Sequence, residues 1–102
     1  MKLQIEWIKK CIRGPKYYYS KHGDIERQND NLTIVEIEEA LLQGSILEHY
    51  PDTGRGWSCL MVGFTKNGKP VHIVCGRRGD SLVVITVYIP SAPKFKTPYE
   101  RG

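Results

Sequence analysis

Long hydrophobic runs, paired cysteines and a signal sequence are all missing from this sequence. No apolar run approaches the roughly 18 residues that span a bilayer, so we expect no membrane partner. Glu6, Lys9 and Lys10 interrupt the first eleven residues, which argues against a secretory signal peptide. The three cysteines form no Cys-x-x-Cys motif, and their odd number argues against a disulfide framework. These absences predict a protein of the reducing cytoplasm.

Familiar catalytic and metal-binding motifs are missing as well. There is no P-loop, no Rossmann glycine pattern and no Gly-x-Ser-x-Gly motif. The nearest candidates for metal ligands fall into two groups: Glu48, His49 and Asp52, and Cys59, His72 and Cys75. Neither group has a recognised ligand spacing, and the strand pairing expected below puts Cys59 and Cys75 on opposite faces. We therefore expect no metal and no cofactor.

What is present is the composition of one small globular domain. The 102 residues are 40% hydrophobic and 25% charged, which suits one domain with a modest core. The net charge is +4 and the isoelectric point is about 9.0. Lysine and arginine concentrate towards the two ends, whereas residues 36–52 are acidic. This asymmetry permits a phosphate-rich partner without requiring one.

Helices are predicted in the first 44 residues. Apolar residues at positions 5, 8 and 12, and at 3, 7 and 11, recur with helical spacing until a Gly-Pro pair ends the pattern. Ser20 can cap a short helix that runs through Arg27. Thr33 and Glu36 form a capping-box pair that opens another helix, and Gly44 suits its C-terminal end.

After residue 44 the hydrophobic pattern changes to period two. Strands are predicted over residues 46–50, 57–66, 69–76 and 82–89, and they form an antiparallel sheet within residues 45–89. Residues 90–102 are rich in proline and lysine and are expected to lie across the surface as a C-terminal tail. The prediction is a single α+β domain over residues 1–102, with residues 1–44 as a helical part packed on a four-stranded antiparallel sheet.

An Asn-Gly pair at residues 67–68 predicts a two-residue hairpin turn that pairs Gly63 with His72. In this register Val62 and Ile73 face the core, while His72 lies on an open face beneath the space that Gly63 leaves. If Val83 then pairs with Cys75, β-branched residues of the last strand stack on the core face. The same pairing puts Thr86 and Tyr88 on the face of His72.

Three groups of side chains suit chemistry on phosphate. An imidazole beside two hydroxyls, at His72, Thr86 and Tyr88, suits proton transfer or phosphate recognition, although an ordinary cross-strand cluster has the same composition. Glu26 lies four residues after His22 and can orient its imidazole, and the adjacent Arg27 can hold a phosphate. The same residues can also form an ordinary solvated helix face. Arg77 and Arg78 follow the strand predicted over residues 69–76, where they suit phosphate contacts and equally suit a turn.

Short motifs in a consistent order carry a resemblance to a known family. They are residues 20–27 (SKHGDIER), 32–36 (LTIVE), 48–51 (EHYP), 58–60 (SCL), 69–74 (KPVHIV) and 84–90 (VITVYIP). In this order the chain resembles the small bacterial domain-of-unknown-function family 4258 over roughly residues 18–101. That family is similar to the RelE-like group of compact ribonuclease toxins. The resemblance implies a RelE-like fold and a toxin held by a cognate antitoxin, often one with a zinc-binding module.

The resemblance also implies which residues act. The family's polar positions fall on six residues of this sequence: His22, Glu26, Arg27, His72, Thr86 and Tyr88. With the two arginines at the strand end added, we expect catalytic roles for His22, Glu26, His72 and Tyr88, and RNA-binding roles for Arg27, Arg77, Arg78 and Thr86. Metal-free RNA cleavage fits these residue types, because a base takes the 2′-hydroxyl proton, a cation stabilises the phosphorane and an acid protonates the leaving 5′-oxygen. The two imidazoles can serve as base and acid in either order.

Three functions are compatible with this reading. The first is the toxin of a type II toxin–antitoxin system, a metal-independent endoribonuclease that cleaves mRNA. The alternative is a non-catalytic module that binds an antitoxin-like protein or RNA. A third is a basic domain with a structural role in a larger assembly. Growth arrest with RNA fragmentation on induced expression distinguishes the enzyme from the binding module.

Overall fold

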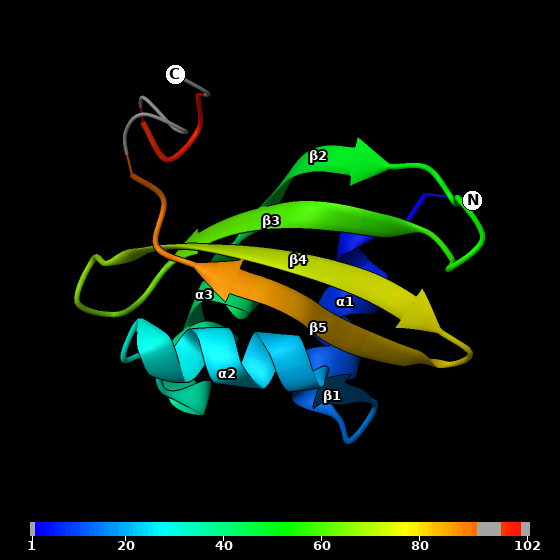
Figure 1. The fold of residues 1–102 in the computed structure, drawn as a ribbon, viewed down its shortest axis with the longest axis horizontal. Helices are drawn as coiled ribbons and strands as arrows, with labels where there is room; N and C mark the ends of the chain where they lie inside the picture. The colour runs from blue at the N-terminus through cyan, green and yellow to red at the C-terminus, as the bar shows by residue number, and fades with distance from the viewer. Residues whose placement is uncertain (1, 92–96, 101–102) are drawn as a thin grey trace.

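The computed structural model describes residues 2–91 and 97–100, which form an α+β fold of helices packed on a mixed sheet (Figure 1). The elements, in chain order, are α1 (Ile5–Arg13), β1 (Tyr17–Tyr19), α2 (Lys21–Asn29), α3 (Ile34–Gln43), β2 (Ser45–Tyr50), β3 (Ser58–Phe64), β4 (Pro70–Arg78) and β5 (Ser81–Tyr88). The strand order is β1-β5-β4-β3-β2. None of the three helices in this described part combines the length and apolar character needed to cross a membrane.

The predicted α+β class is confirmed, but the predicted four-stranded antiparallel sheet is wrong. The five-stranded sheet is mixed, because β1 pairs in parallel with β5. Backbone bonds extend this pairing: the Leu82 amide donates to the Lys16 carbonyl at 2.9 Å, and the Ser20 amide to the Val84 carbonyl at 3.0 Å. Three consecutive tyrosines are too few to show the two-residue hydrophobic alternation that predicts a strand, so only the pairing with β5 identifies β1 as one.

Local capping signals define the starts of α2 and α3 as the sequence predicts. The Ser20 hydroxyl accepts a hydrogen bond from the Gly23 amide at 2.9 Å at the start of α2. At α3 the Thr33 hydroxyl accepts from the Glu36 amide at 3.0 Å, and the Glu36 carboxylate accepts from the Thr33 amide at 2.9 Å. The capping box therefore satisfies two backbone donors that would otherwise lack a partner.

The helices are divided between one face of the sheet and one edge. In Figure 1, α1 and α3 lie behind the sheet, while α2 runs along β5. Fully buried Ile8 and Leu41 of the rear helices pack in one core with Met61, Ile73 and Val87 of the strands. We call the sheet face that points away from α1 and α3 the front face.

The β3–β4 hairpin is paired one residue away from the predicted register. Val62 lies opposite His72, and Gly63 lies opposite Val71. The loop has three residues, because the Thr65 amide donates to the Lys69 carbonyl at 3.0 Å and the Thr65 hydroxyl accepts from the Lys69 amide at 3.1 Å. Residue 68 is a glycine with φ of +81°, as such a loop requires.

This shift exchanges the two faces of β3. Met61 and Gly63 face the helices, whereas Leu60 and Val62 face the front, opposite to the prediction. The close packing of α3 supplies the physical reason, because a Cβ on Gly63 would lie 1.9 Å from the Ala40 carbonyl oxygen. Only a glycine fits there, so the residue predicted to leave space above His72 instead leaves space for α3.

A bulge in β5 corrects the predicted register of the last strand. Tyr88 pairs with His72 and Thr86 with Val74, as their predicted front-face positions require. The register then shifts so that Cys75 pairs with Val84 rather than with Val83, and Ile85 is the extra residue.

The two strand cysteines share the helix-facing side. Cys59 and Cys75 are direct partners across β3 and β4, both buried as free thiols, so their predicted placement on opposite faces is wrong. The slip in the β3 register accounts for this error, because one residue of slip moves Cys59 to the other face.

Candidate functional site

His22 and Glu26 form an exposed acid–imidazole pair on α2. Their spacing of four residues puts both side chains on one helix face, and His22 Nε2 lies 3.3 Å from Glu26 Oε1. The His22 side chain is 68% exposed and the Glu26 side chain is 29% exposed. The imidazole therefore faces solvent, with a half-buried carboxylate positioned to orient it.

Glu26 also belongs to the junction between α2 and the sheet. Its Oε1 accepts a hydrogen bond from the Val87 amide at 3.3 Å, and Asp30 Oδ2 accepts from the Ile89 amide at 3.1 Å. β1 pairs only with Leu82, Val83 and Val84, so the rest of this edge of β5 has no neighbouring strand among the described residues. The two carboxylates accept hydrogen bonds from amides on that unpaired part of the edge. Gly23 permits this close approach, since a Cβ there would lie 2.6 Å from the Val84 carbonyl oxygen.

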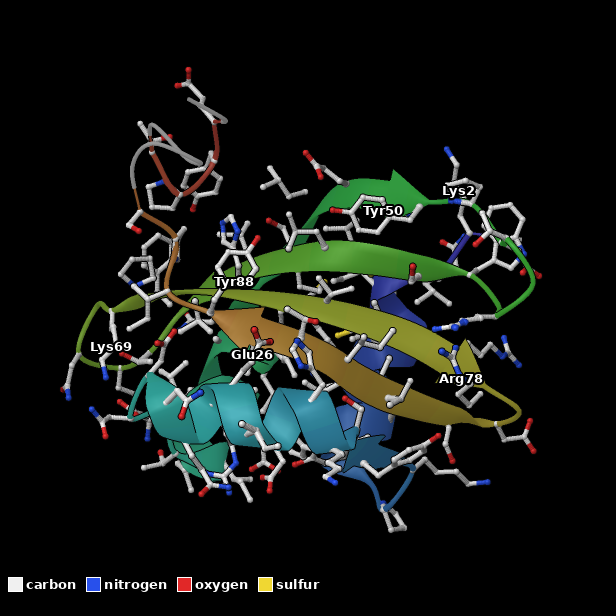
Figure 2. All side chains as sticks on the ribbon, viewed as in Figure 1. Lys2, Glu26, Tyr50, Lys69, Arg78 and Tyr88 are labelled. Atoms are coloured by element: carbon white, nitrogen blue, oxygen red, sulfur yellow. The ribbon has the colours of Figure 1, made fainter. Side chains whose placement is uncertain are left out.

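A small pocket joins this helix to Tyr88. It encloses about 220 Å³ and is lined by Glu26, Asn29, Asp30, Val87 and Tyr88. Figure 2 shows Glu26 and Tyr88 on either side of the end of β5. We call this cavity the α2–β5 pocket.

His72 lies next to Tyr88 on the front face and is fully buried. His72 Nδ1 is 3.2 Å from the Tyr88 hydroxyl, and the two rings meet edge to face with centroids 5.2 Å apart. His72 Nε2 is 2.6 Å from the Pro98 carbonyl oxygen. Because a carbonyl only accepts, Nε2 carries a proton, and in the neutral ring Nδ1 then accepts from the Tyr88 hydroxyl.

The expectation that His72 lies on an open face is therefore wrong. The chain beyond β5 returns to this face, where Pro98 contacts His72 and the Tyr99 ring lies 6.1 Å from the Phe64 ring. Residues 92–96 and 101–102 of the predicted C-terminal tail lie outside the described residues. The four residues proposed as catalytic still form a contiguous series, from His22 to Glu26, across the α2–β5 pocket to Tyr88, and from there to His72.

The four residues proposed to bind RNA do not converge. Arg27 donates to Asp24 Oδ1 at 2.8 Å and to the Leu32 carbonyl, which fixes its guanidinium within α2 and the following turn. The Arg77 guanidinium lies 4.8 Å from the centre of the Trp7 ring, beside α1. Only Arg78 and Thr86 share the front face with Tyr88.

A second front-face pocket contains side chains that the sequence analysis did not select. It encloses about 320 Å³ between the β2–β3 loop and the strands, and we call it the arginine pocket. Its lining includes Tyr50, Arg55, Ser58, Arg78 and Ile85. Thr53 also lines it, so that three hydroxyls accompany the two guanidinium groups, although the Tyr50 hydroxyl donates to Glu48 Oε1 at 2.7 Å. Two guanidinium groups in one hollow suit a phosphate group.

The shape of the β2–β3 loop brings Arg55 to this pocket. Asp52 Oδ1 accepts hydrogen bonds from the Gly54 amide at 2.8 Å and the Gly56 amide at 2.9 Å, which lowers the pKa of the Asp52 carboxyl. Both glycines have positive φ, of +110° and +94°. An arginine between two glycines after an aspartate was the available sequence signal for a shaped loop, although it did not indicate what the loop faces.

The described residues offer no metal centre. Across residues 2–91 and 97–100, no group of three or more histidine, cysteine, aspartate or glutamate side chains is arranged to hold a metal ion. Burial raises the pKa of the Cys59 thiol to about 12 and that of Cys75 well above its usual value. Both thiols therefore stay protonated near neutral pH in the folded protein.

Comparison with known proteins identifies one family. A family model described as a domain of unknown function, DUF4258, matches residues 19–89, from the end of β1 to just beyond β5. No curated protein and no solved structure matches the chain. The matched segment includes α2, the arginine pocket and the series from His22 to His72, whereas α1 precedes it.

Proposed function

Since the chain belongs to the DUF4258 family, a domain of unknown function, we propose an activity from its own residues: a metal-independent endoribonuclease that cleaves mRNA. In this proposal the fold is RelE-like, and the protein is the toxin of a type II toxin–antitoxin system. Its proposed partners are RNA and a cognate antitoxin protein, of the kind that carries a zinc-binding module. The observation that carries the proposal is the meeting of two polar pairs, His22 with Glu26 and Tyr88 with His72, at the α2–β5 pocket.

The proposed reaction needs one base and one acid. Exposed His22, oriented by Glu26, takes the proton of the RNA 2′-hydroxyl, and the 2′-oxygen attacks the adjacent phosphorus. The bond from phosphorus to the 5′-oxygen breaks, and the Tyr88 hydroxyl gives its proton to that oxygen. The products are a 2′,3′-cyclic phosphate and a 5′-hydroxyl. In this step the single proton of the Tyr88 hydroxyl turns from His72 Nδ1 to the leaving oxygen, and the buried His72 ring, packed edge to face, holds the Tyr88 ring in position.

The arginine pocket supplies the cationic part of the proposed RNA path. Ile85 lines this pocket, and Tyr88 lines the α2–β5 pocket three residues later on the same strand. At ~3.3 Å per strand residue the two pockets are about 10 Å apart along β5. Thr86 lies between them on the front face, opposite Val74. Phosphates held by Arg55 and Arg78 would thereby align the neighbouring nucleotide with His22.

Induced expression of the full chain tests the proposal. We expect growth arrest with fragmented RNA, and purified protein should leave cyclic-phosphate ends. His22→Ala should slow cleavage by roughly 10²–10⁴-fold because it removes the proposed base. Its thermal unfolding should stay unchanged, since the side chain is mostly exposed. Lys21→Ala, the preceding position on α2, is the matched control and should cleave normally.

A non-catalytic binding module is the second candidate, favoured by the burial of His72 and its contacts at both ring nitrogens. This candidate predicts normal growth and intact RNA at confirmed soluble expression. It also predicts that RNA is still retarded in a gel-shift assay by the unmodified chain. That combination, or an unchanged cleavage rate in folded His22→Ala protein, would remove the ribonuclease proposal.

A further inference from the structure

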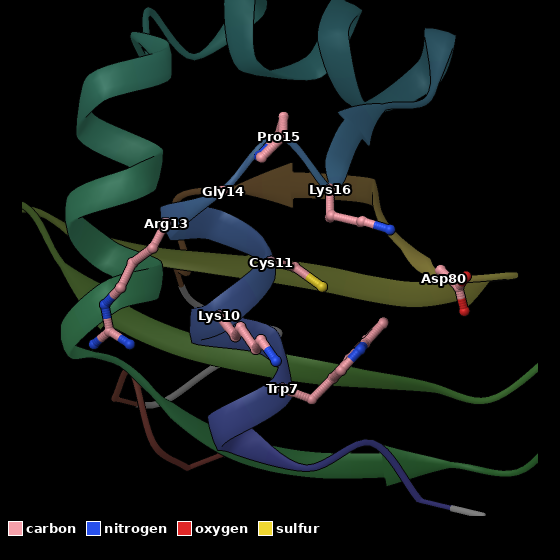
Figure 3. Close-up of a pocket in the computed structure, with 8 residues that line it drawn as sticks. All are labelled: Trp7, Lys10, Cys11, Arg13, Gly14, Pro15, Lys16 and Asp80. Carbon is pink, nitrogen blue, oxygen red and sulfur yellow. The ribbon is translucent and has the colours of Figure 1, made fainter.

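A large pocket lies on the opposite side of the sheet from the front face. It encloses about 540 Å³ and lies between α1, the α1–β1 connection and the turn between β4 and β5. Its lining residues are Trp7, Lys10, Cys11, Arg13, Gly14, Pro15, Lys16 and Asp80 (Figure 3). All of these except Asp80 precede residue 19, so most of the pocket lies outside the segment that matches the family.

The pocket combines apolar walls with unpaired cations. In Figure 3 the Cys11 sulfur points into the space bordered by Trp7, Lys16 and Asp80, while the Arg13 side chain points away from it. The Arg77 guanidinium flanks the pocket, stacked 4.8 Å from the centre of the Trp7 ring. Among residues 2–91 and 97–100, no carboxylate lies within ion-pair distance of Lys10 or Lys16.

The pKa of the Cys11 thiol, which lines the pocket, reflects the charges around it. Burial raises the pKa of Cys11, while a backbone contact with Leu82 and the positive charges of Arg77, Lys16 and Lys10 act in the opposite direction. Three positively charged side chains therefore surround the buried Cys11 sulfur. The C-terminal end of α1 contributes only about half a negative charge, and Asp80 one more, so the pocket remains positive.

We propose that this pocket binds one nucleotide, with its base against Trp7 and its phosphate at Lys10 and Lys16. An inorganic anion would leave the apolar walls of Trp7 and Pro15 without a partner. An acidic peptide would meet repulsion at Asp80, whereas an amino-bearing base brings N–H donors that a carboxylate accepts. A volume of about 540 Å³ lies within the usual range for a small-molecule site.

The source of the nucleotide is either a free nucleoside monophosphate or one residue of single-stranded RNA. Both present the same base and phosphate to the pocket. The proposal does not depend on cleavage, because its residues lie on the far side of the sheet from His22 and Tyr88. A cleavage-deficient His22→Ala protein should therefore bind nucleotide normally.

Tryptophan fluorescence provides the test, in a full-length Trp57→Phe background that leaves Trp7 as the only tryptophan. Guanosine monophosphate should quench Trp7 saturably, and guanosine or inorganic phosphate should bind more weakly. Lys10→Gln with Lys16→Gln should weaken binding at least about tenfold by removing both phosphate contacts. Lys2→Gln with Lys9→Gln removes the same charge outside this pocket and should change binding less than about twofold.

Two further measurements decide the ligand. Asp80→Ala should weaken binding of guanosine monophosphate but strengthen binding of inorganic phosphate. A single-stranded hexaribonucleotide that binds more tightly than the mononucleotide identifies RNA as the source. Its salt slope should fall by ~0.7 when both lysines are replaced, because the two lysines hold one phosphate. Equal affinities identify the free nucleotide.

The proposal is overturned by any of three results. The first is the absence of Trp7 quenching by millimolar guanosine monophosphate. The second is equal affinity of the two double-lysine variants, each confirmed as folded by its thermal unfolding. The third is displacement or exclusion of the nucleotide by an oligoglutamate peptide that itself binds more tightly.

Discussion

Gly63 lies where β3 crosses α3, and the helix backbone occupies the space that a side chain would need. A Cβ at this position would lie 1.9 Å from the Ala40 carbonyl oxygen and 2.6 Å from its carbonyl carbon. Real Cβ atoms do not approach backbone this closely, so α3 can pack on the sheet only against a glycine. The identity of this one residue fixes which face of β3 meets the helices.

Gly63→Ala should therefore destabilise the protein by about 3 kcal/mol or more, because α3 must move away from the sheet. Urea denaturation followed by circular dichroism measures the change. Gly14→Ala is the matched control: its Cβ would lie 3.6 Å from the nearest atom, and the free energy of unfolding should change by less than about 0.5 kcal/mol. Equal stabilities of the two variants would contradict the observed packing of α3 on β3.

At the scale of elements, α2 protects the edge of the sheet beyond the short strand β1. The Ser20 hydroxyl donates to the Ile85 carbonyl at 3.0 Å, and Glu26 and Asp30 accept from amides further along β5. The two carboxylates are four residues apart on the helix, or about 6 Å, which matches two residues along a strand. α2 and its capping residues therefore satisfy backbone hydrogen-bonding groups of β5. Left unpaired, this edge would offer a template for pairing with a strand of another chain.

Two substitutions at Glu26 separate this edge role from the proposed catalysis. Glu26→Gln keeps an oxygen acceptor for the Val87 amide but loses the charge beside His22, so cleavage should fall while stability changes little. Glu26→Ala loses both and should also destabilise the fold by about 1–2 kcal/mol. RNA cleavage assays and urea denaturation measure the two effects. Full cleavage by Glu26→Gln would show that Glu26 serves the fold alone.

At the scale of the whole molecule, the sheet separates two polar regions. The front face carries the arginine pocket and the Tyr88–His72 pair, and α1 borders the proposed nucleotide pocket on the other side. Between them lies a core that contains buried thiols as well as hydrocarbon side chains. This core makes the stability of the entire fold sensitive to alkaline pH.

Alkaline pH should destabilise the protein through Cys59 and Cys75. Burial raises their pKa values in the folded state, to about 12 for Cys59, whereas an unfolded thiol ionises near pH 8.5. Their contribution is complete below about pH 8.5 and is lost as pH rises towards 12, at about 1.4 kcal/mol per pH unit for each thiol.

Urea denaturation between pH 7.5 and about pH 10.5 measures this dependence, and Cys75→Ala should flatten it by the contribution of one thiol. Tyr17 and Tyr19 act in the same direction, because burial raises their pKa values too. A free energy of unfolding that stays constant over this range would contradict the burial of the thiols.

The sequence alone determined those features whose causes lie within a few residues. Capping at Ser20 and Thr33 needs only a partner three positions away, and it predicts where α2 and α3 begin. Period-two patterning predicts β2 to β5, and i,i+4 spacing predicts the contact of His22 with Glu26. The front-face positions of Thr86 and Tyr88 also followed, because alternation along one strand does not depend on its neighbours.

Tertiary structure alone decided the pairings between segments. The β3 register depends on α3 packing against Gly63 and on a loop of three residues, while Asn-Gly by itself favoured two. The burial of His72 depends on Pro98, which is 26 residues away along the chain. Such contacts form only when distant segments compete for the same space, and burial and backbone hydrogen bonding across the whole fold decide between registers that local patterns leave nearly equal.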